Sequence, residues 1–413
     1  MKTVICMLNS KFIHSSLAPW CLLASVREYC GESVEAKVVE GTVNEKMSSV
    51  AERILSENAD TVAFCCYIWN INSAFELCDI IKERSGAIII LGGPEVSYNP
   101  QSVLENRKNV DFVLCGEGEE SFPALCRKID GEDIFVSGLC YRENGRIICT
   151  PAEKPKSEPV SPYTPEYFET LNGRIAYIET SRGCPFSCAF CLSGADKGVK
   201  FYDMERVKGE ITALANSGTQ TVKFVDRTFN ANANRANDII TFIIENYGGS
   251  IPENVCFHFE IDGGTLKEST MELLKNAPAG LFQLEVGLQS FNSRTLTAVN
   301  RKPDTEKLCE NIKKLVSFGN MHIHVDLIAG LPFEDFASFR NSFNLLYELK
   351  PNMLQLGFLK LLHGSELRNN SETFGCVYSE KAPYEVIRTD CLSEDDIKNI
   401  HFAEDGLERL YNS

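Results

Sequence analysis

The chain has 413 residues, of which 44% are hydrophobic and 24% are charged, and its formal net charge is −16 at pH 7. This length predicts two or three domains, and no apolar run is long enough to cross a bilayer. The negative charge disfavours a broad polyanion-binding surface and therefore a nucleic-acid partner. The N-terminus does not resemble a signal peptide, so we expect a cytoplasmic protein in which most of the 17 cysteines are reduced thiols.

Residues 1–135 alternate short apolar runs with amphipathic stretches. Strands are predicted at 3–8, 34–39, 61–66, 87–92 and 111–115. Helices are predicted between and after them, at about 17–30, 46–57, 71–84, 98–106 and 119–129. Five successive βα units of this kind predict a doubly wound, Rossmann-like α/β domain with a parallel sheet.

Residues 136–172 are predicted to connect this domain to a second one. Asn144 and Gly145 lie between two strand-like arms, which is the strongest short-range signal for a β-hairpin. Residues 151–166 contain five prolines and little apolar periodicity, so we expect an extended linker there. A domain boundary therefore belongs in this stretch.

A second βα series follows over residues 173–365. Strands are predicted near 175–180, 221–226, 255–260, 281–287, 322–328 and 353–359. Six units of this kind fit a partial or full TIM barrel, in which the strands form the inner wall. Residues 366–413 are irregular and then helical at 393–411, and we expect this short helical segment to be the start of a longer domain.

The run GCPFSCAFC places Cys184, Cys188 and Cys191 directly after the first strand of the second series. At this cysteine content, the spacing should arise by chance only about 0.03 times in such a chain. Three thiolates on a compact loop can converge on one iron–sulfur cluster, and the missing fourth ligand leaves one iron open to a substrate. The alternatives are a zinc site, which normally closes four ligands, and three structural thiols.

The spacing C-x3-C-x2-C, with the aromatic Phe190 before the last cysteine, resembles that of the radical S-adenosylmethionine superfamily. The resemblance implies a 4Fe-4S cluster whose open iron binds the amino and carboxylate groups of S-adenosylmethionine. It also implies reductive cleavage to a 5′-deoxyadenosyl radical and an electron donor of the flavodoxin or ferredoxin type. Enclosure in a barrel would keep such a radical away from solvent.

Barrel active sites form at the carboxyl ends of the strands, so polar residues at those positions are candidate ligands. The resemblance implies that residues near the ends of the second, fourth and fifth strands contact S-adenosylmethionine. Glu260 is a further candidate contact because it lies at the end of the third strand. The predicted contacts are Phe190, Asp226, Glu260, Glu285, Gln289, Arg301, Gly330 and Leu331. The alternative for each polar residue is a strand-end group that caps the next helix.

Other polar residues at the barrel mouth are weaker candidates. Arg227, Asn230, Asp262 and Ser290 follow predicted strands. His322 and His324 alternate with apolar residues and are interpreted first as core or barrel-mouth side chains. His363, after the sixth strand, is a candidate substrate contact.

The carboxyl edge of the first domain's predicted sheet is rich in glycine and aromatic residues. An open α/β sheet binds ligands at this edge, and glycine permits close approach of a bulky ligand. Two runs at successive strand ends, GGPE at residues 92–95 and GEGE at residues 116–119, resemble those of the cobalamin-binding domain found in one branch of the superfamily. The cobalamin contacts that we predict are Ser10, His14, Tyr67, Trp69, Gly92, Gly93, Pro94, Glu95, Gly116, Glu117, Gly118 and Glu119.

Residues 9–20 resemble the first loop of a subgroup that also carries a C-terminal domain of unknown function. The chain lacks the DxHxxG motif of carriers that ligate cobalt with histidine. We therefore expect cobalt to bind without a histidine ligand from the protein. His14 is a candidate cobalt ligand or otherwise a loop contact. A domain without a cofactor, or with a nucleotide, is the alternative, although GxGxxG is missing after the first strand.

Taken together, the resemblances imply an enzyme that methylates an unactivated carbon of a small-molecule or peptide substrate. One S-adenosylmethionine would donate the methyl group, and a second would supply the radical. The first alternative is a cobalamin-dependent rearrangement, cyclisation or redox reaction. The others are a methylthiotransferase acting on tRNA or protein and a non-enzymatic sensor.

Overall fold

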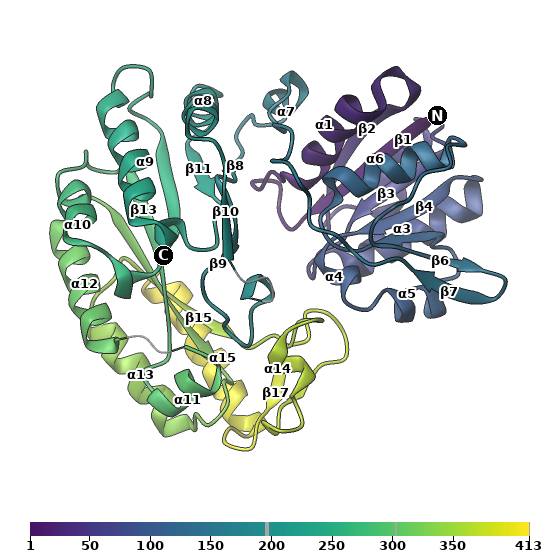
Figure 1. Cartoon of the computed structure of the whole chain (residues 1–413). Helices are drawn as coiled ribbons and strands as arrows, with labels where there is room; N and C mark the ends of the chain where they lie inside the picture. The colour runs from purple at the N-terminus through teal and green to yellow at the C-terminus, as the bar shows by residue number, and fades with distance from the viewer. Residues whose placement is uncertain (195–197, 302–303, 413) are drawn as a thin grey trace. The chain divides into compact units, whose positions relative to one another are not determined.

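The computed structural model describes residues 1–194, 198–301 and 304–412. The chain divides into two compact units, Met1–Arg174 and Ile175–Ser413, and each has its own mainly parallel sheet (Figure 1). The predicted boundaries of the individual domains stay predictions. Among the described residues, no helix has both the length and the apolar character needed to span a membrane.

The first unit is built on a seven-stranded sheet of order β2-β1-β3-β4-β5-β6-β7. The first five of these strands are parallel, which confirms the predicted doubly wound arrangement. The strands are β1 (Lys2–Asn9), β2 (Glu35–Thr42), β3 (Thr61–Cys65), β4 (Ile88–Gly92), β5 (Phe112–Leu114), β6 (Leu139–Glu143) and β7 (Arg146–Cys149).

Helices cover both faces of this sheet, so its central strands are apolar along nearly their whole length. All five residues of β3 are buried, as expected for a parallel strand covered on both sides. The helices are α1 (Ala18–Cys30), α2 (Met47–Leu55), α3 (Ile71–Arg84), α4 (Pro94–Ser97), α5 (Pro100–Asn106) and α6 (Gly118–Ile129). The helix predicted at 98–106 begins only at Pro100, because Asn99 has a non-helical backbone and proline favours the first helical position.

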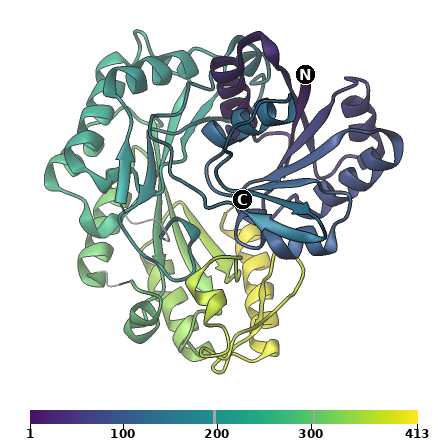
Figure 2. The ribbon, with the colours of Figure 1, turned by 45° about the vertical axis from the view of Figure 1, so that its right-hand side comes forward.

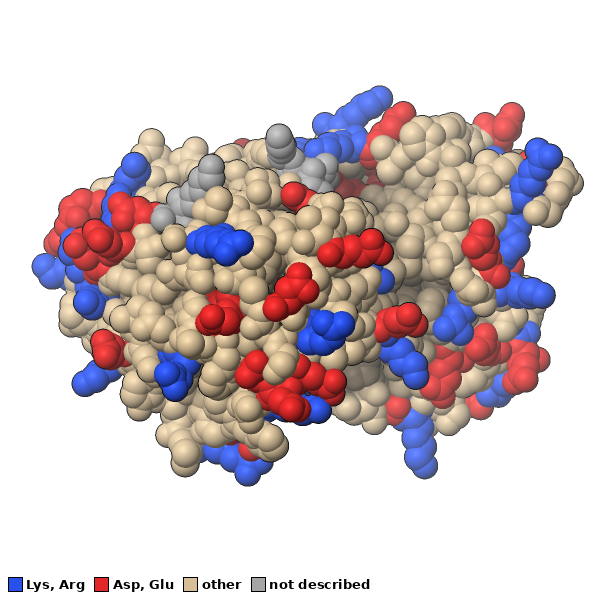
Figure 3. Space-filling model, turned by 90° about the horizontal axis from the view of Figure 1, so that it is seen from below, with Lys and Arg blue, Asp and Glu red and all other residues tan. Residues whose placement is uncertain are grey.

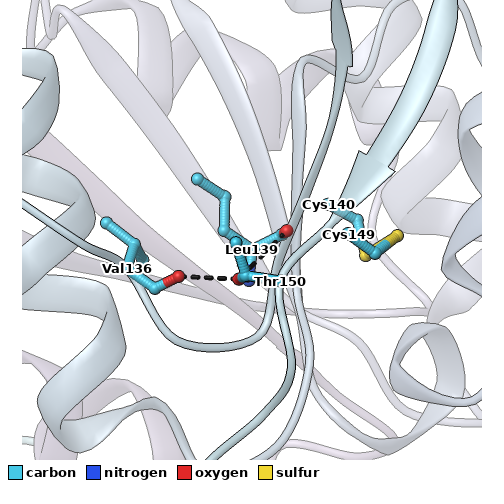
Figure 4. Close-up of a disulfide and its surroundings, with 5 residues drawn as sticks. All are labelled: Val136, Leu139, Cys140, Cys149 and Thr150. Atoms are coloured by element: carbon cyan, nitrogen blue, oxygen red, sulfur yellow. Dashed lines mark hydrogen bonds between the residues drawn. A yellow bond between two sulfur atoms is a disulfide. The ribbon is translucent and has the colours of Figure 1, made fainter.

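The predicted hairpin at 138–150 is confirmed as β6 and β7. Asn144 and Gly145 have φ of 50° and 76°, the left-handed conformation that a tight two-residue turn needs. Cys140 lies opposite Cys149 on these strands, and the two form a disulfide (Figure 4). The other fifteen cysteines that the structure describes are free thiols, in line with the expectation for most of them.

Residues 151–164 form neither helix nor strand, as the prolines predicted, and α7 (Pro165–Glu169) follows. The unit ends at Arg174, whose side chain is only 7% exposed and pairs with Glu40 at 2.8 Å. A buried arginine needs such a partner, because an unpaired charge inside a protein is strongly unfavourable.

The second unit contains a six-stranded parallel sheet of order β15-β14-β13-β12-β11-β8. The end strands β8 and β15 do not pair with each other in the described sheet, so the six-unit prediction is confirmed in its partial-barrel form. The strands are β8 (Ala176–Ile178), β11 (Thr221–Phe224), β12 (Cys256–Ile261), β13 (Phe282–Gln289), β14 (His322–Ala329) and β15 (Met353–Phe358).

Helices lie along the outer face of this curved sheet (Figures 1 and 2). They are α8 (Met204–Ala215), α9 (Ala233–Asn246), α10 (Glu268–Lys275), α11 (Ser293–Ala298), α12 (Thr305–Phe318) and α13 (Phe336–Glu348). Phe259 of β12 faces the helices, since it borders a small cavity together with Ile240 of α9 and Leu274 of α10. Side chains alternate along a strand, so His258 and Glu260 point to the inner face.

The C-terminal part of the second unit contains α14 (Glu366–Asn369), the short antiparallel pair β16 (Val377–Tyr378) and β17 (Val386–Arg388), and α15 (Glu394–Leu410). The helix predicted at 393–411 is confirmed, and its start is fixed by a capping box between Ser393 and Asp396. The two short strands were not predicted, because two or three residues carry too little periodicity.

On the face shown in Figure 3, Lys and Arg side chains are interspersed with Asp and Glu. Proteins that bind nucleic acid usually gather their cations in a stripe or patch. Among the described residues on this face, the basic side chains form no continuous stripe.

Candidate active site

The three predicted cluster cysteines lie on one loop after β8, residues 184–191, which we term the cysteine loop. An antiparallel hairpin of β9 (Ser181–Cys184) and β10 (Gly198–Phe201) carries Cys184 at its end. Gly183 has φ of 101°, and a side chain there would come within 2.3 Å of the Gly198 carbonyl oxygen. Only glycine fits at this position, which explains the residue before the first cysteine.

Backbone hydrogen bonds hold the middle of the cysteine loop from two sides. The Ala189 N–H donates to the Val299 carbonyl at 3.1 Å, and the Leu367 N–H donates to the Ala189 carbonyl at 2.8 Å. The Cys191 N–H donates to the Cys188 carbonyl at 3.0 Å and closes a turn. Segments distant in sequence therefore set the positions of Cys188 and Cys191.

Asp226, just after β11, is 1% exposed and supports the start of the hairpin. Its carboxylate accepts hydrogen bonds from the Thr180 N–H at 3.2 Å, from the Thr180 hydroxyl at 3.0 Å and from the Ser181 hydroxyl. Burial raises the pKa of Asp226 to about 6, although these hydrogen bonds favour the ionised form. Both carboxylate oxygens are engaged, so the visible role of Asp226 is to position the hairpin, and its contact with S-adenosylmethionine stays a prediction.

Polar groups from neighbouring segments approach two of the three thiols. Thr228 Oγ1 lies 3.5 Å from Cys184 Sγ, and Arg301 Nη1 lies 3.7 Å from Cys188 Sγ. Burial raises the pKa of the Cys188 thiol, and the Arg301 guanidinium opposes that effect. A cation beside a cysteine favours the thiolate, which is the form that binds iron. Arg301 also donates to the Gly287 carbonyl at 2.8 Å and so links the loop to β13.

Ionisable side chains of β11, β12 and β13 form a charged cluster on the inner face of the barrel. Lys223 Nζ and His258 Nε2 lie 3.2 Å and 3.0 Å from the same oxygen of Glu285, and Lys223 lies 3.7 Å from Glu260. Burial alone would raise the pKa of Glu285, but the hydrogen bond with His258 and the charge of Lys223 hold it at about 2. Burial and the charge of Glu285 raise the pKa of Glu260.

The sequence prediction missed Lys223 and His258 as partners of Glu285. The pattern that could have identified His258 is its alternation, with Glu260, between the buried residues Phe257 and Phe259 on β12. Polar residues that alternate with buried aromatic residues indicate a strand with one polar, enclosed face.

Two buried polar atoms of β13 and β14, Gln289 Oε1 and His322 Nε2, lack a hydrogen-bond partner among the described residues. His324 Nε2 and Asp326 Oδ1 lie 3.0 Å apart and form an ion pair when the histidine is protonated. Gln289 also has φ of 75°, an unfavourable backbone conformation for a residue other than glycine. Strain and unsatisfied polar atoms together mark a candidate ligand site.

Glu285, His324 and Asp326 place possible metal-ligand atoms within 4.8 Å of one another. Carboxylate and imidazole groups at such distances can bind a divalent cation. Lys223 already supplies a positive charge to this group, 3.2 Å from Glu285. The geometry therefore favours a hydrogen-bonding surface over a cation site.

Glu334 was not predicted, and it connects the loops after β13 and β14. It has 0% exposure, and its Oε1 accepts hydrogen bonds from Ser290 Oγ at 2.6 Å and Ser342 Oγ at 3.1 Å. Burial raises the pKa of Glu334 to about 7. Ser290 follows Gln289, and Glu334 lies three residues after Leu331, so this carboxyl group links the chain segments that carry these two predicted contacts.

The predicted contacts Gly330 and Leu331 form the turn at the end of β14. Leu331 is buried, and Gly330 has φ of 89°. A side chain on Gly330 would come within 2.5 Å of Val386 Cγ1, so the C-terminal part of the unit packs directly on this turn.

The first loop of the first unit is fixed through its main chain. The Ser10 carbonyl accepts a hydrogen bond from Asn44 Nδ2 at 3.2 Å, and the His14 carbonyl accepts one from Arg174 at 2.6 Å. Arg174 also pairs with Glu40. The role of the His14 side chain toward cobalt stays a prediction.

Aromatic side chains lie exposed at the carboxyl edge of the same sheet. Tyr67 and Trp69, after β3, stack with ring centroids 4.4 Å apart, and Trp69 Nε1 donates to the Leu8 carbonyl at 3.1 Å. Trp69 is 45% exposed, and Phe12 in the first loop is 69% exposed. This edge thus offers a broad apolar surface to a large, flat ligand.

The two glycine-rich runs, residues 92–95 and 116–119, lie at the carboxyl ends of β4 and β5, as predicted. Gly93 has φ of 108°, and a side chain there would come within 2.5 Å of the Cys66 carbonyl oxygen, so the fold itself requires this glycine. Pro94 and Glu95 begin α4, whereas Glu117 is the N-cap residue of α6. The runs therefore place the starts of two helices at one edge, and their cobalamin contacts stay predictions.

Comparison with protein-family models identifies three regions of the chain. Residues 178–346 match the radical SAM superfamily, and residues 4–126 match the B12 binding domain. Residues 372–413 match a protein family of unknown function, DUF4080.

The chain is similar to the cobalamin-dependent radical SAM methyltransferase TokK of Streptomyces tokunonensis, with 26% identity over 307 residues, covering 70% of this chain and 45% of TokK. It is 25% identical to the uncharacterized methyltransferase PH0819 of Pyrococcus horikoshii, covering 76% of this chain and 69% of that protein. The chain thus spans less than half the length of TokK. The structure of the radical S-adenosylmethionine methyltransferase TsrM from Kitasatospora setae matches 92% of this chain and 77% of its own, with a TM-score of 0.73 and 16% identity. At this identity, the likeness to TsrM shows the fold alone.

Proposed function

We propose that the chain is a cobalamin-dependent radical SAM enzyme that methylates an unactivated carbon, because one region of it matches the B12 binding domain and another matches the radical SAM superfamily. The observation that carries the proposal is the cysteine loop: three thiols, fixed from two sides, next to a barrel whose inner strands carry buried polar atoms without partners. The similarity to TokK supports methyl transfer as the outcome.

We assign the 4Fe-4S cluster to Cys184, Cys188 and Cys191. The loop supplies no fourth cysteine, so three thiolates would bind three irons and leave the fourth iron to a non-protein ligand. Arg301 supports this assignment, because its guanidinium beside Cys188 stabilises a thiolate in a partly buried position.

The inner face of the barrel fits S-adenosylmethionine. Ribose hydroxyl groups are hydrogen-bond donors, and Gln289 Oε1 is a buried acceptor without a hydrogen-bond partner among the described residues. Glu260 adds a carboxyl group near Lys223, where burial raises its pKa. Of the other predicted contacts, Phe190 lies on the cysteine loop, Arg301 lies between α11 and α12, and Gly330 and Leu331 follow β14.

The carboxyl edge of the first unit fits cobalamin. A corrin ring is large, flat and apolar on its faces, and the exposed Trp69, stacked on Tyr67, presents a surface of that kind. When bound, the cluster and S-adenosylmethionine supply a radical that removes a hydrogen atom, and cobalamin supplies the methyl group. The protein's contribution is to bind, orient and enclose these groups. We propose a small-molecule substrate, cytoplasmic localisation and a flavodoxin or ferredoxin as electron donor.

The deciding experiment follows the methyl group. The anaerobically reconstituted protein is incubated with S-adenosylmethionine labelled in its methyl group, a reductant and candidate substrates, and the products are examined by mass spectrometry. Label in the product supports methyl transfer. Release of 5′-deoxyadenosine with an unlabelled, altered product would instead indicate rearrangement, cyclisation or redox chemistry, and a labelled thiomethyl group would indicate a methylthiotransferase.

A second experiment tests the cluster assignment. Replacing Cys184, Cys188 or Cys191 with Ala should abolish iron binding and cleavage of S-adenosylmethionine. Cys309, a half-buried free thiol on α12, provides the matched control, and Cys309→Ala should retain both. Unchanged cleavage of S-adenosylmethionine in the three loop variants would refute the proposed enzyme.

A further inference from the structure

We propose that the C-terminal hairpin, residues 376–388, holds the cysteine loop in place through Arg368 and thereby sets how firmly the iron–sulfur cluster is retained. This gives a role to the start of the region that matches the family of unknown function. The inference rests on the cluster assignment made above.

The C-terminal hairpin is paired with the chain that leaves β15. The Val386 N–H donates to the Leu359 carbonyl at 2.9 Å, and the Leu361 N–H donates to the Tyr384 carbonyl at 3.0 Å. Val386, Leu359 and Leu361 are at most 2% exposed, so these bonds are shielded from water. The segment 359–361 is therefore fixed by residues of the hairpin.

Arg368, in α14, connects the hairpin to the same segment by a second route. Its guanidinium lies over the rings of Tyr378 and Tyr384, at 5.1 Å and 4.6 Å from their centroids. Its Nη1 donates to the Leu361 carbonyl at 2.6 Å, and its backbone N–H donates to Ser365 Oγ, which caps the helix. A planar cation held by two rings and a directed hydrogen bond restricts the orientation of α14.

The other side of α14 meets the cysteine loop. Leu367 has 0% exposure, and its N–H donates to the Ala189 carbonyl at 2.8 Å. Glu366 accepts a hydrogen bond from Asn300 at 2.9 Å, and the neighbouring Val299 carbonyl accepts the Ala189 N–H at 3.1 Å. Both backbone groups of Ala189 are thus bound to segments that α14 ties together.

The position of Ala189 explains why this chain of contacts concerns the cluster. Ala189 lies between Cys188 and Cys191. Greater mobility of the Ala189 backbone would therefore displace two of the three cluster ligands. Losing the anchoring of Arg368 should make cluster loss roughly fivefold faster, the factor that corresponds to one net hydrogen bond. Arg368 acts through α14 and is therefore a positioning residue.

The test is the rate at which the reconstituted protein loses iron to a chelator under anaerobic conditions. Arg368→Leu should lose iron about fivefold faster than the native chain, and Arg368→Lys should restore part of the difference by keeping the cation. The matched control is Arg107→Leu in the first unit, where Arg107 lies over the Phe75 ring at 4.1 Å. This control removes an equivalent stacking contact and should leave iron loss unchanged.

Hydrogen exchange of the apoprotein provides a readout that needs no cluster. In Arg368→Leu the amides of Ala189 and Cys191 should exchange faster, whereas those of β12 should not change. If that variant does not fold, Tyr378→Leu removes one of the two rings and should shift both readouts in the same direction. Iron loss and exchange equal to those of the native chain would overturn the proposal. A native chain that takes up no cluster would refute the proposed function instead, and exchange would still decide the role of Arg368.

Discussion

Glu334 offers a test of whether the loops after β13 and β14 are coupled through a buried carboxyl group. Its side chain has 0% exposure and accepts hydrogen bonds from Ser290 and Ser342. Glutamine keeps the accepting oxygen but cannot ionise. We predict that Glu334→Gln removes a pH dependence from the stability of the second unit.

The size of the effect follows from the pKa of Glu334, which burial raises from 4.5 to about 7. The folded protein holds this proton more tightly than the unfolded chain does. The free energy of unfolding is therefore highest below the unfolded pKa and falls as the pH rises from about 4.5 to about 7. A shift of this size corresponds to a loss of about 3 kcal/mol, which the glutamine variant should not show.

The assay is urea unfolding of the apoprotein at about pH 4 and about pH 8, the two sides of the expected transition. Far-UV circular dichroism is the suitable signal, because both tryptophans, Trp20 and Trp69, lie in the first unit. The exposed Glu372→Gln serves as the control and should follow the native chain at both pH values. A stability difference between Glu334→Gln and the native protein that does not change with pH would refute the reasoning.

Two glycine substitutions test the backbone at the two candidate sites. Gly93→Ala should destabilise the first unit by about 3 kcal/mol, because φ is 108° and the new side chain would meet the Cys66 carbonyl at 2.5 Å. Tryptophan fluorescence in denaturant measures this, with the uncrowded Gly86→Ala as control; equal effects would contradict the steric argument. Gly330→Ala should destabilise the second unit by about 2 kcal/mol, measured by circular dichroism, because φ is 89° and Val386 Cγ1 is 2.5 Å away. Adding Val386→Ala should recover only the steric part, and full recovery would show that the backbone is not strained.

Features that depend on neighbouring residues were predictable from the sequence. The βα alternation, the doubly wound class of the first unit and the Asn144–Gly145 turn all follow from local periodicity and the short connections of parallel sheets. The cysteine spacing is equally local, because Cys184, Cys188 and Cys191 share one loop. The short hairpin β9–β10 escaped prediction, since its pairing is decided by contact between strands whose own patterns are weak.

The hydrogen bonds that hold the candidate site in place join residues far apart in the chain. Asp226 meets Thr180 across 46 positions, and Glu334 meets Ser290 across 44. Sequence periodicity cannot predict such pairs, because each partner is an ordinary polar residue in its local sequence. The two partners become neighbours only when the barrel brings the strand ends together.

The cysteine loop shows which features are determined by the sequence alone and which by the tertiary structure. Its sequence by itself determined the number, spacing and chemical type of the three thiols, because these are properties of adjacent residues. Only the tertiary structure decided what holds these thiols: the bonds from Val299 and Leu367 to Ala189, and the guanidinium of Arg301 beside Cys188. Burial sets the protonation of Asp226 and Glu334 in the same way, since the folded chain alone removes those carboxyl groups from water.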